Sequence, residues 1–397
     1  GIRYRIRGLE CRRVLFRSID TKVRHILETI ISYGFLDRDQ TDSSIPLNDP
    51  KSAETALDLA REGIVLLKNE NNVLPFSKNS TFLLLGPNAA KCVTGGGSGG
   101  LVTTYSCNSL LNGMKEVAGT KNITFDKLLY AQDVATCGEF FAEKGSSETG
   151  FKAEYYNNSE LAGKPSIIET VPAINFTWEA DQPLRGNPKN HFSARWTTVY
   201  KPVNNALVVF RLNTTHGFRM FIDDREVMNN WTTLNRNYEA SLRVEAGKEY
   251  NIRIEHFNRS LEATAKLTYE KVDLENETWL KSLQNAENIL LSIGFDSFTE
   301  KENQDRSFEI PVWQEELINI IAPYNKNVIA IVNAGGGVNF SSWSDKVQGI
   351  LLVWYNGQEG GKAIAEIVTG AISPSGRLPV SVRSEEHTSE LQSPNTI

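Results

Sequence analysis

The segment from Thr299 to Arg306 gathers charged side chains that could do chemistry. It reads Thr-Glu-Lys-Glu-Asn-Gln-Asp-Arg, so that Glu300 and Glu302 lie two residues apart and Asp305 directly precedes Arg306. A carboxyl group can transfer protons in a reaction when burial or a neighbouring charge adjusts its pKa. Most glutamates in loops, however, are surface residues without a chemical role. The residues alone leave both interpretations open.

A glycine-rich stretch forms a second candidate site. Gly95 to Gly100 reads Gly-Gly-Gly-Ser-Gly-Gly, and it comes after a predicted strand and the tripeptide Gly86-Pro-Asn88. Glycine allows a backbone to approach a ligand closely, but a flexible surface loop has the same composition. The stretch lacks the spacing of phosphate-binding and dinucleotide-binding loops, so we do not expect it to bind a nucleotide.

Composition and charge exclude several functional classes. The chain has 42 Lys and Arg residues against 48 Asp and Glu residues and no long basic run, which argues against nucleic acid as a partner. No apolar stretch reaches the roughly 18 residues of a membrane span, so we expect no membrane partner. We also expect no metal and no cofactor, because metal-ligand spacing is absent around His25, His191, His216 and His256.

Strand and helix patterns alternate in two separated parts of the chain. In residues 51–145, a helix that starts at Ser52 is followed by strands at 64–67 and 81–85. In residues 276–382, strands at 289–293, 328–332 and 350–354 alternate with helices at 312–322 and 358–368. The alternation predicts an α/β domain with a mostly parallel sheet flanked by helices. Each part is too short to close a sheet, so we expect both to build one domain.

Residues 146–275 follow a different pattern. Apolar residues recur at every second position, as at Tyr250, Ile252 and Ile254, which is typical of half-buried antiparallel strands. We therefore expect an all-β sandwich domain inserted into an exposed loop of the α/β domain, where insertions are well tolerated.

The two ends of the chain look foreign to the rest. Residues 383–393 back-translate without a mismatch into the common short-read sequencing adapter, and residues 8–18 closely resemble the same adapter on the opposite strand. We interpret residues 1–18 and 383–397 as adapter-derived; the alternative is a basic arm and a polar tail. Residues 19–38 have helical spacing with Gly34 at the expected helix end, and the polar residues 39–50 are typical of a linker.

N-glycosylation sequons indicate in which cellular compartment the protein is found. Asn-x-Ser/Thr occurs nine times, which favours a secreted or extracellular glycoprotein, at Asn79, Asn122, Asn157, Asn175, Asn213, Asn230, Asn258, Asn276 and Asn339. An Asn-rich chain also produces sequons by chance, so a cytoplasmic or periplasmic location stays open. Cys92 and Cys107 flank the glycine-rich stretch and could pair, but cysteine usage alone does not decide the compartment.

Several motifs, taken in order, resemble one known family. They are Glu62-Gly-Ile-Val-Leu-Leu-Lys-Asn69, Gly86-Pro-Asn-Ala89, Gly95-Gly-Gly-Ser98, Glu302-x-x-Asp305-Arg306, Trp354-Tyr-Asn-Gly-Gln-Glu-Gly360 and Pro374-Ser-Gly-Arg-Leu-Pro379. Their order and spacing resemble the second, α/β sandwich domain of glycoside hydrolase family 3. No single motif is specific, but the ordered series is.

The resemblance extends to the flanking and inserted segments. Residues 146–275 are similar to the protective-antigen-type sugar-binding module, through Glu154-Tyr-Tyr156, Arg195-Trp196, Arg219-x-Phe-Ile-Asp223 and Trp231. Residues 19–38 are similar to the last helix of the (β/α)8 barrel that precedes the α/β domain in this family. The resemblance therefore implies that the barrel is missing from this chain.

The family's chemistry implies roles for individual residues. Retaining glycosidases use two carboxyl groups, one as nucleophile and one as acid/base. The resemblance places the acid/base at Glu302, with Glu300 as the alternative, although Asn303 replaces the usual glycine of the motif. It implies that Asp305 and Arg306 form an ion pair that orients the loop. The family's nucleophile is an aspartate of the barrel, so no residue of this chain is assigned that role.

The glycine-rich stretch and an aromatic pair would line the substrate. Gly95, Gly96, Gly97 and Ser98 are candidates for a loop that closes over the sugar, and Trp354 and Tyr355 could stack on a sugar or belong to the core. The resemblance implies a fragment of an exo-acting β-glucosidase, inactive alone, whose partner is an oligosaccharide or β-glycoside. The alternatives are a β-xylosidase or α-arabinofuranosidase of the same family and a non-catalytic carbohydrate-binding protein. Sugar specificity and oligomeric state are not determined by the sequence.

Overall fold

The computed structural model describes residues 2–46, 48–95, 103–178, 191–231, 236–259, 262–297, 299–300, 302 and 306–381. The chain divides into two compact units, residues 1–52 and 53–397. In the first unit, helix α1 (Ile2–Ser32) continues without a break through residue 18, the predicted end of the adapter-derived residues. Gly34, the predicted helix end, follows this helix and has a φ of 65°. Within the described ranges, no helix combines the length and apolar character that a membrane crossing needs.

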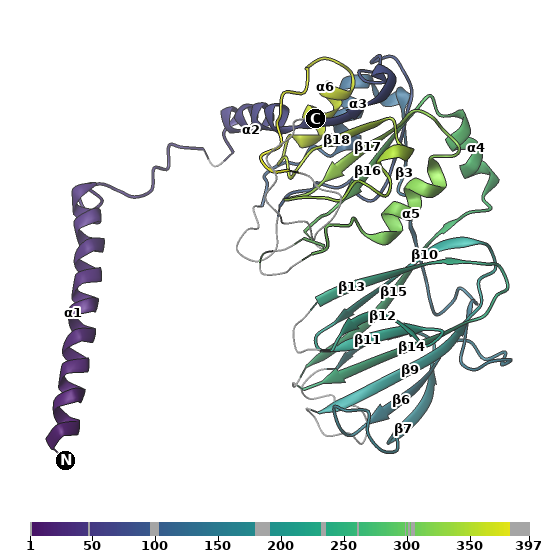
Figure 1. The fold of residues 1–397 in the computed structure, drawn as a ribbon, viewed down its shortest axis with the longest axis horizontal. Helices are drawn as coiled ribbons and strands as arrows, with labels where there is room; N and C mark the ends of the chain where they lie inside the picture. Colours follow the sequence, from purple (N-terminus) through teal and green to yellow (C-terminus); the bar gives the residue numbers. More distant parts are fainter. Residues whose placement is uncertain are drawn as a thin grey trace. The chain divides into compact units, whose positions relative to one another are not determined.

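A six-stranded sheet forms the middle layer of one part of the second unit (Figure 1). Its strands run in the order β1-β18-β17-β16-β2-β3, so segments from both ends of the unit share one sheet. All neighbours are parallel except β1, which pairs with β18 in antiparallel fashion. The strands are β1 (Val65–Asn69), β2 (Phe82–Leu85), β3 (Ile123–Asp126), β16 (Asn288–Gly294), β17 (Val328–Asn333) and β18 (Gly349–Leu352).

Helices cover both faces of this sheet, which explains why its strands are continuous apolar runs. One face packs on α2 (Pro50–Gly63), α3 (Leu110–Ala118) and α6 (Gly360–Val368). The other face packs on α4 (Glu277–Asn285) and α5 (Val312–Ile321). Short 3₁₀ turns lie at η1 (Glu70–Asn72), η3 (Thr120–Asn122) and η4 (Ser344–Lys346). The predicted helices and strands of this sheet are confirmed to within a few residues.

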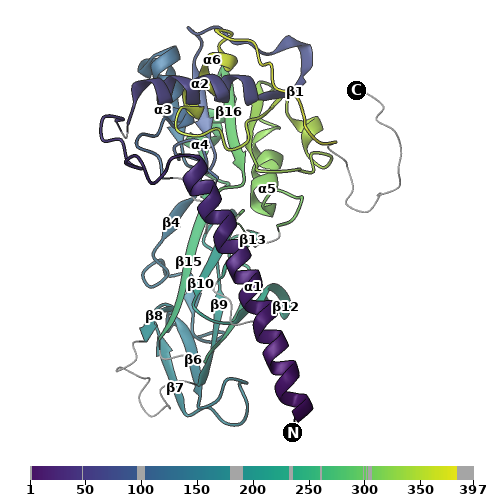
Figure 2. The same cartoon turned by 90° about the vertical axis from the view of Figure 1, so that its left-hand side faces the viewer.

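Between β3 and α4 the described chain forms strands and no helix (Figure 2). One sheet has the order β13-β10-β15-β4 with β8 beside β15, and the other has the order β12-β11-β14-β9-β6-β7 with β5 beside β9. The strands are β4 (Tyr130–Gln132), β5 (Phe140–Phe141), β6 (Phe151–Tyr156), β7 (Ile167–Val171), β8 (Asn175–Trp178), β9 (Phe192–Tyr200), β10 (Ala206–Thr214), β11 (Phe218–Ile222), β12 (Arg225–Asn230), β13 (Arg236–Val244), β14 (Tyr250–Asn258) and β15 (Ala263–Asp273). All pairings in both sheets are antiparallel.

The change of architecture comes earlier in the chain than the sequence predicts. Strands β4 and β5 lie within residues 51–145, yet they pair with β15 and β9 of the antiparallel sheets. Both strands are very short, and a run of two or three residues is too brief for its period to be recognised.

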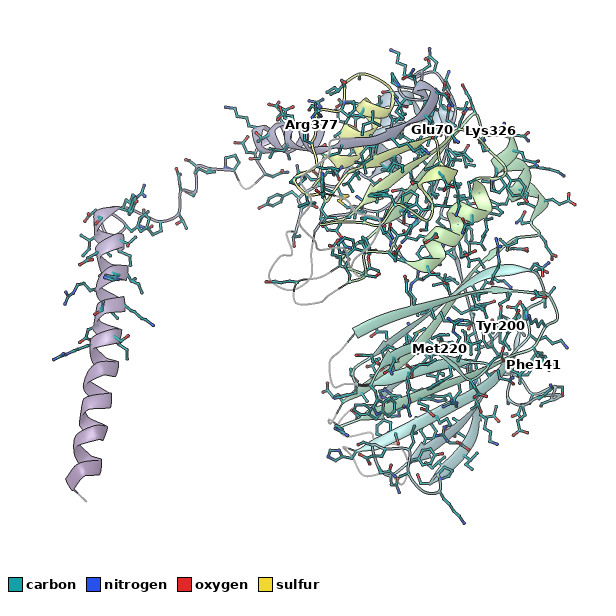
Figure 3. The ribbon with its side chains drawn as sticks, in the orientation of Figure 1. Glu70, Phe141, Tyr200, Met220, Lys326 and Arg377 are labelled. Carbon is teal, nitrogen blue, oxygen red and sulfur yellow. A yellow bond between two sulfur atoms is a disulfide. The ribbon has the colours of Figure 1, made fainter. Side chains whose placement is uncertain are left out.

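Two cores meet at strand β10. Leu207 and Val209 pack in the same cluster as α4 and α5, whereas the alternate residues Val208 and Phe210 pack between the antiparallel sheets. Tyr200 and Met220, labelled in Figure 3, are also buried in this second cluster. Because successive side chains of a strand point to opposite faces, β10 joins the two parts of the unit through its own residues.

Burial separates the nine predicted sequons into three groups, and the intermediate group, which is half-buried, consists of Asn122 and Asn339. Asn230 and Asn258 are 4% and 1% exposed, which makes their amides inaccessible in the folded chain. Asn79, Asn157, Asn175, Asn213 and Asn276 are exposed.

His256 is fully buried among aromatic rings of the antiparallel sheets. Its ring stacks against Trp178 at a centroid distance of 6.1 Å and lies 6.3 Å from Trp196. Its Nδ1 atom is 3.1 Å from the carbonyl oxygen of Gly217, and its Nε2 atom has no hydrogen-bond partner among the described residues. Burial lowers the pKa of His256 to about 3, so the folded protein holds it neutral.

The chain should therefore lose stability in mild acid. The unfolded state binds a proton at this histidine below pH ~6.5 and the folded state does not, so the free energy of unfolding falls by up to about 1.4 kcal/mol per pH unit below that value. His256→Phe keeps an aromatic ring and removes the titrating group, so we expect a flatter dependence between pH 7 and 5 in urea denaturation. The exposed-helix variant His25→Phe is the control. A slope that His256→Phe leaves unchanged would contradict the assignment.

Candidate active site

The candidate site lies at the carboxyl ends of three parallel strands, where ligands bind in open α/β sheets. Strand β16 leads into Phe295 and the charged segment, β17 leads into the glycines 335–337, and β18 leads into Trp354 and Tyr355. Parallel strands bring these three loops to one edge of the sheet.

Glu300 lies at the centre of the contacts in this region. Its Oε2 atom accepts hydrogen bonds from the backbone N–H of Gly335 at 2.8 Å and from the hydroxyl of Tyr355 at 2.5 Å. Its Oε1 atom forms an ion pair with Nε of Arg306 at 2.8 Å. Burial opposes ionisation of Glu300, but these hydrogen bonds and the charge of Arg306 outweigh it and hold the pKa of the carboxyl below its usual range.

Arg306 is fixed by more than its ion pair. Nη1 donates to the carbonyl oxygen of Gly337 at 3.0 Å and to that of Ser307 at 2.9 Å. The guanidinium carbon lies 4.0 Å from the centre of the Phe295 ring, a distance typical of a cation–π contact. The predicted partner Asp305 lies outside the described residues, and the partner that the structure gives to Arg306 is Glu300.

The other predicted site residues are only partly described. Glu302 lies in a turn and is exposed. Gly95 is half-buried, and a Cβ atom added to it would lie 3.3 Å from Cδ2 of Tyr355. Gly96, Gly97 and Ser98 lie outside the described residues. A disulfide joins Cys92 to Cys107, with a Cα–Cα distance of 5.7 Å, and so closes the segment that begins the glycine-rich stretch.

Trp354 takes a backbone conformation that side chains rarely adopt, with a φ of 52°. Its Nε1 atom donates to the carbonyl oxygen of Gly63 at 3.0 Å, at the end of α2. Trp354 and Tyr355 line a pocket of about 290 Å³ together with Ala56 and Leu59 of that helix. The pair is therefore neither wholly core nor wholly exposed.

Two further cavities adjoin the charged segment. A cleft of about 1050 Å³ is lined by Phe295, Thr299 and Arg306 from the α/β part and by Ile222 and Tyr250 from the antiparallel sheets. A smaller pocket of about 340 Å³ lies beside Asn88 and Asp296. Among the described residues, no group of His, Cys, Asp or Glu side chains could hold a metal ion.

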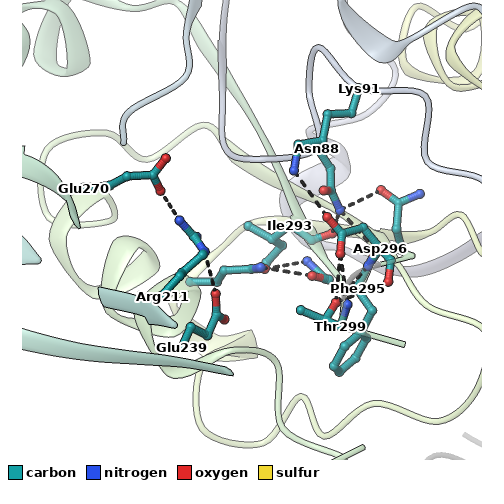
Figure 4. A network of polar contacts seen from close by, with 12 residues as sticks. Asn88, Lys91, Arg211, Glu239, Glu270, Ile293, Phe295, Asp296 and Thr299 are labelled. Atoms are coloured by element: carbon teal, nitrogen blue, oxygen red, sulfur yellow. Dashed lines mark hydrogen bonds and ion pairs between the residues drawn. The ribbon is translucent and has the colours of Figure 1, made fainter. Parts of the chain in front are cut away.

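A polar network fixes the start of the charged segment (Figure 4). Asp296 accepts hydrogen bonds at Oδ1 from the backbone N–H of Thr299 at 3.2 Å and from its hydroxyl at 3.1 Å, and its other carboxylate oxygen pairs with Lys91 at 3.2 Å. Asn88, from the predicted Gly86-Pro-Asn motif, donates to the carbonyl oxygen of Phe295 at 3.3 Å. The motif thus holds the loop that leads to Glu300.

The same figure shows a separate ion-pair cluster on the antiparallel sheets. Arg211 of β10 pairs with Glu239 at 3.1 Å and with Glu270. Glu239 also accepts a 2.8 Å hydrogen bond from Nε1 of Trp313 in α5. Burial raises the pKa of Glu239 although Arg211 and Trp313 act in the opposite direction. A buried acceptor of this kind depends on its donors.

Trp313→Phe should therefore destabilise the chain by more than the lost packing. Trp279 is the matched control, because it lies in the same cluster and its buried Nε1 atom has no hydrogen-bond partner in the described part of the chain. We expect Trp313→Phe to lower the free energy of unfolding by about 1–3 kcal/mol more than Trp279→Phe does in urea denaturation. Equal losses in the two variants would show that the bond to Glu239 contributes nothing.

The sequence missed the central contact of the site. Glu300 was expected as an alternative acid/base, and Tyr355 as a stacking or core residue, but the two are bonded to each other. Their separation of 55 residues left no local pattern. The available signal was that each lies in the loop that follows a strand of the same sheet, Glu300 after β16 and Tyr355 after β18.

Comparison with known proteins gives a consistent picture. Residues 64–396 match the family model for the glycosyl hydrolase family 3 C-terminal domain. A β-glucosidase of Rhizobium radiobacter is 28% identical over 389 residues, which cover 92% of this chain and 46% of that protein. A xylan 1,4-β-xylosidase of Xylanibacter ruminicola is 26% identical over 395 residues, which cover 92% and 45% respectively. The chain thus spans about half the length of the curated relatives that it matches.

Solved structures share the fold. A β-glucosidase from Streptomyces venezuelae in complex with D-glucose superposes with a TM-score of 0.53 at 20% identity, covering 91% of this chain and 42% of that one. A β-glucosidase from Kluyveromyces marxianus superposes with a TM-score of 0.51 at 20% identity, covering 91% and 46%.

Proposed function

Because the chain belongs to glycoside hydrolase family 3, we propose that it is part of a retaining, exo-acting β-glycosidase of the β-glucosidase type. Its substrate is an oligosaccharide or β-glycoside that carries a terminal β-linked sugar. The observation that carries the proposal is the charged segment, held at the carboxyl edge of the sheet and bordered by a cleft of about 1050 Å³. A cleft of this size accommodates a sugar ligand.

Glu302 is the acid/base of the proposed enzyme. As an acid it protonates the leaving oxygen while a nucleophile attacks the anomeric carbon, and as a base it then takes a proton from the water that releases the sugar. Two observations favour it over Glu300. Glu302 is exposed, as a group that meets substrate must be. Glu300 is held ionised by Tyr355, Gly335 and Arg306, so it is poorly suited to donate a proton.

The remaining parts of the proposed enzyme lie outside this chain. The curated relatives are about twice as long, which supports a (β/α)8 barrel that supplies the nucleophile. The apolar side chains of α1 that are exposed in its own unit, such as Val23, Ile26 and Ile31, are consistent with a helix that belongs to that barrel. Residues 146–275 serve as the protective-antigen-type module, and residues 1–18 and 383–397 are adapter-derived. The uninterrupted transcript sequence tests the barrel and both ends directly.

The chain alone should have no glycosidase activity, because half of the carboxylate pair is absent. We expect no turnover of aryl β-glucosides above that of a Glu302→Ala control. Turnover that the wild-type chain shows and the Glu302→Ala chain lacks would overturn the proposal that this is an incomplete enzyme.

In the full-length enzyme, Glu302→Ala should affect substrates according to how much their leaving group needs a proton. General acid assistance contributes about 10²- to 10⁴-fold, so hydrolysis of a disaccharide should fall by that factor. The dinitrophenolate group of a dinitrophenyl glycoside leaves without a proton, so the glycosyl-enzyme should form quickly. It should accumulate as a burst, because the base that activates water for the second step is missing. Azide needs no deprotonation and should restore turnover by forming the β-glycosyl azide.

Glu300→Ala is the matched control for that experiment. Because Glu302 is still present as the base, its burst and its azide rescue should both be much smaller than those of Glu302→Ala. If Glu300→Ala shows both and Glu302→Ala behaves as wild type, the acid/base is Glu300; if neither variant shows them, the acid lies elsewhere.

Two alternatives are distinguished by substrate. The similarity to a xylan 1,4-β-xylosidase makes a β-xylosidase or α-arabinofuranosidase the nearest alternative, and the ratio of kcat/KM for aryl β-xylosides and aryl β-glucosides separates them. A non-catalytic carbohydrate-binding protein would bind on a glycan array through residues 146–275 while the full-length protein turns over no glycoside.

A further inference from the structure

A contact between Glu300 and Arg306 joins the two ends of the charged segment. The two side chains form an ion pair at 2.8 Å across the five residues between them, and Glu302 lies inside that closed segment. Their side chains are only 21% and 13% exposed, so the pair is largely shielded from solvent. A shielded pair holds its geometry more firmly than a surface pair.

Three strand ends fasten the closed segment to the sheet. Phe295, after β16, lies under the guanidinium of Arg306. The loop after β17 contributes the N–H of Gly335 to Glu300. Tyr355, after β18, donates its hydroxyl to the same carboxylate. Among the described contacts, the carboxylate of Glu300 therefore joins three parts of the site: the loop after β17, the loop after β18 and Arg306 at the end of the charged segment.

Tyr355 has little freedom to move. A Cβ atom on Gly335 would lie 3.0 Å from its Cε2 atom, and one on Gly95 would lie 3.3 Å from its Cδ2 atom. The ring therefore packs between the backbone at Gly335 and the backbone that begins the glycine-rich stretch. Its hydroxyl pKa is raised by burial and by Glu300, so the tyrosine stays a neutral donor.

We propose that Tyr355 and Glu300 are positioning residues that hold the Glu302 segment on the strand ends, through a tyrosine–carboxylate hydrogen bond and the Glu300–Arg306 ion pair. The inference rests on the proposed function, since it takes Glu302 as the acid/base. Neither residue transfers a proton to substrate. Their contribution is the placement of Glu302 relative to the leaving oxygen.

The test is a double-mutant cycle in the full-length enzyme. Tyr355→Phe removes the hydroxyl and keeps the ring, and Glu300→Gln removes the charge and keeps the shape. Misplacement of a catalytic group by about 1 Å costs on the order of 100-fold, so each single variant should lower kcat/KM for a disaccharide by about 10- to 100-fold. Hydrolysis of a dinitrophenyl glycoside, which needs no acid, should stay within about twofold for the first step.

Repeating the two substitutions in a Glu302→Ala background distinguishes a role in positioning Glu302 from a role in stabilising the fold. In a Glu302→Ala background, Tyr355→Phe and Glu300→Gln should cause no further loss on the disaccharide, because residues that act through one group are not additive. Tyr130→Phe is the control: it removes a 2.8 Å tyrosine–carboxylate bond to Asp126 at the end of the edge strand β3, and it should leave kcat/KM unchanged.

The outcomes that would overturn the inference are distinct. Equal losses with and without Glu302, or equal losses on both substrates, would mean that the two residues only stabilise the fold. If Glu302→Ala leaves disaccharide hydrolysis intact, the acid assignment fails and the positioning role fails with it. Azide rescue of Glu300→Ala that equals the rescue expected of Glu302→Ala, with none in Glu302→Ala, would make Glu300 itself the acid/base. Should Glu300→Gln lose its circular dichroism spectrum, Tyr355→Phe still decides the question.

Discussion

The ion pair between Glu300 and Arg306 organises the candidate site, because the other contacts converge on its two members. The carboxylate receives a backbone N–H and a tyrosine hydroxyl, and the guanidinium donates to a carbonyl and stacks on Phe295. Each contact compensates in part for the removal of a charge from water, and Nε of Arg306 meets Glu300 as an ion pair without a hydrogen bond. Removal of one member would leave the other charged and shielded without its partner, a far greater loss than the pair itself contributes.

The position of that pair depends on a sheet assembled from distant parts of the chain. Strand β2 pairs with β16 across roughly 200 residues, as Leu83 faces Ile289. The intervening antiparallel strands return the chain to within pairing distance, and β10 packs on α4 and α5 through Leu207 and Val209. The antiparallel part is therefore bound to the α/β part by shared apolar packing as well as by the bond between Glu239 and Trp313.

Local patterns predicted the elements well, and pairings across the chain less well. The apolar runs of β2, β16 and β17 and the helical period of α5 were sufficient, because burial on both faces leaves a strong signal. The antiparallel edge at β1 and the short strands β4 and β5 were not predicted, since pairing direction and strands of two or three residues leave no periodic pattern. At the site, composition singled out the segment that carries Glu300 and Glu302. It did not reveal the bond to Tyr355, because that bond depends on how strands β16 and β18 are placed in the sheet.

The strand order of the six-stranded sheet has a consequence for synthesis on the ribosome. Strand β2 emerges with only β3 available as a parallel neighbour, and its other edge must wait for β16, which starts roughly 160 residues after the end of β3. At about 5–20 residues per second this interval lasts about 10–30 s. An unpaired apolar strand edge is a template for aggregation during that time. The antiparallel strands, which pair only among themselves in the described residues, can fold within the interval, so the nascent chain completes the antiparallel sheets before the six-stranded sheet.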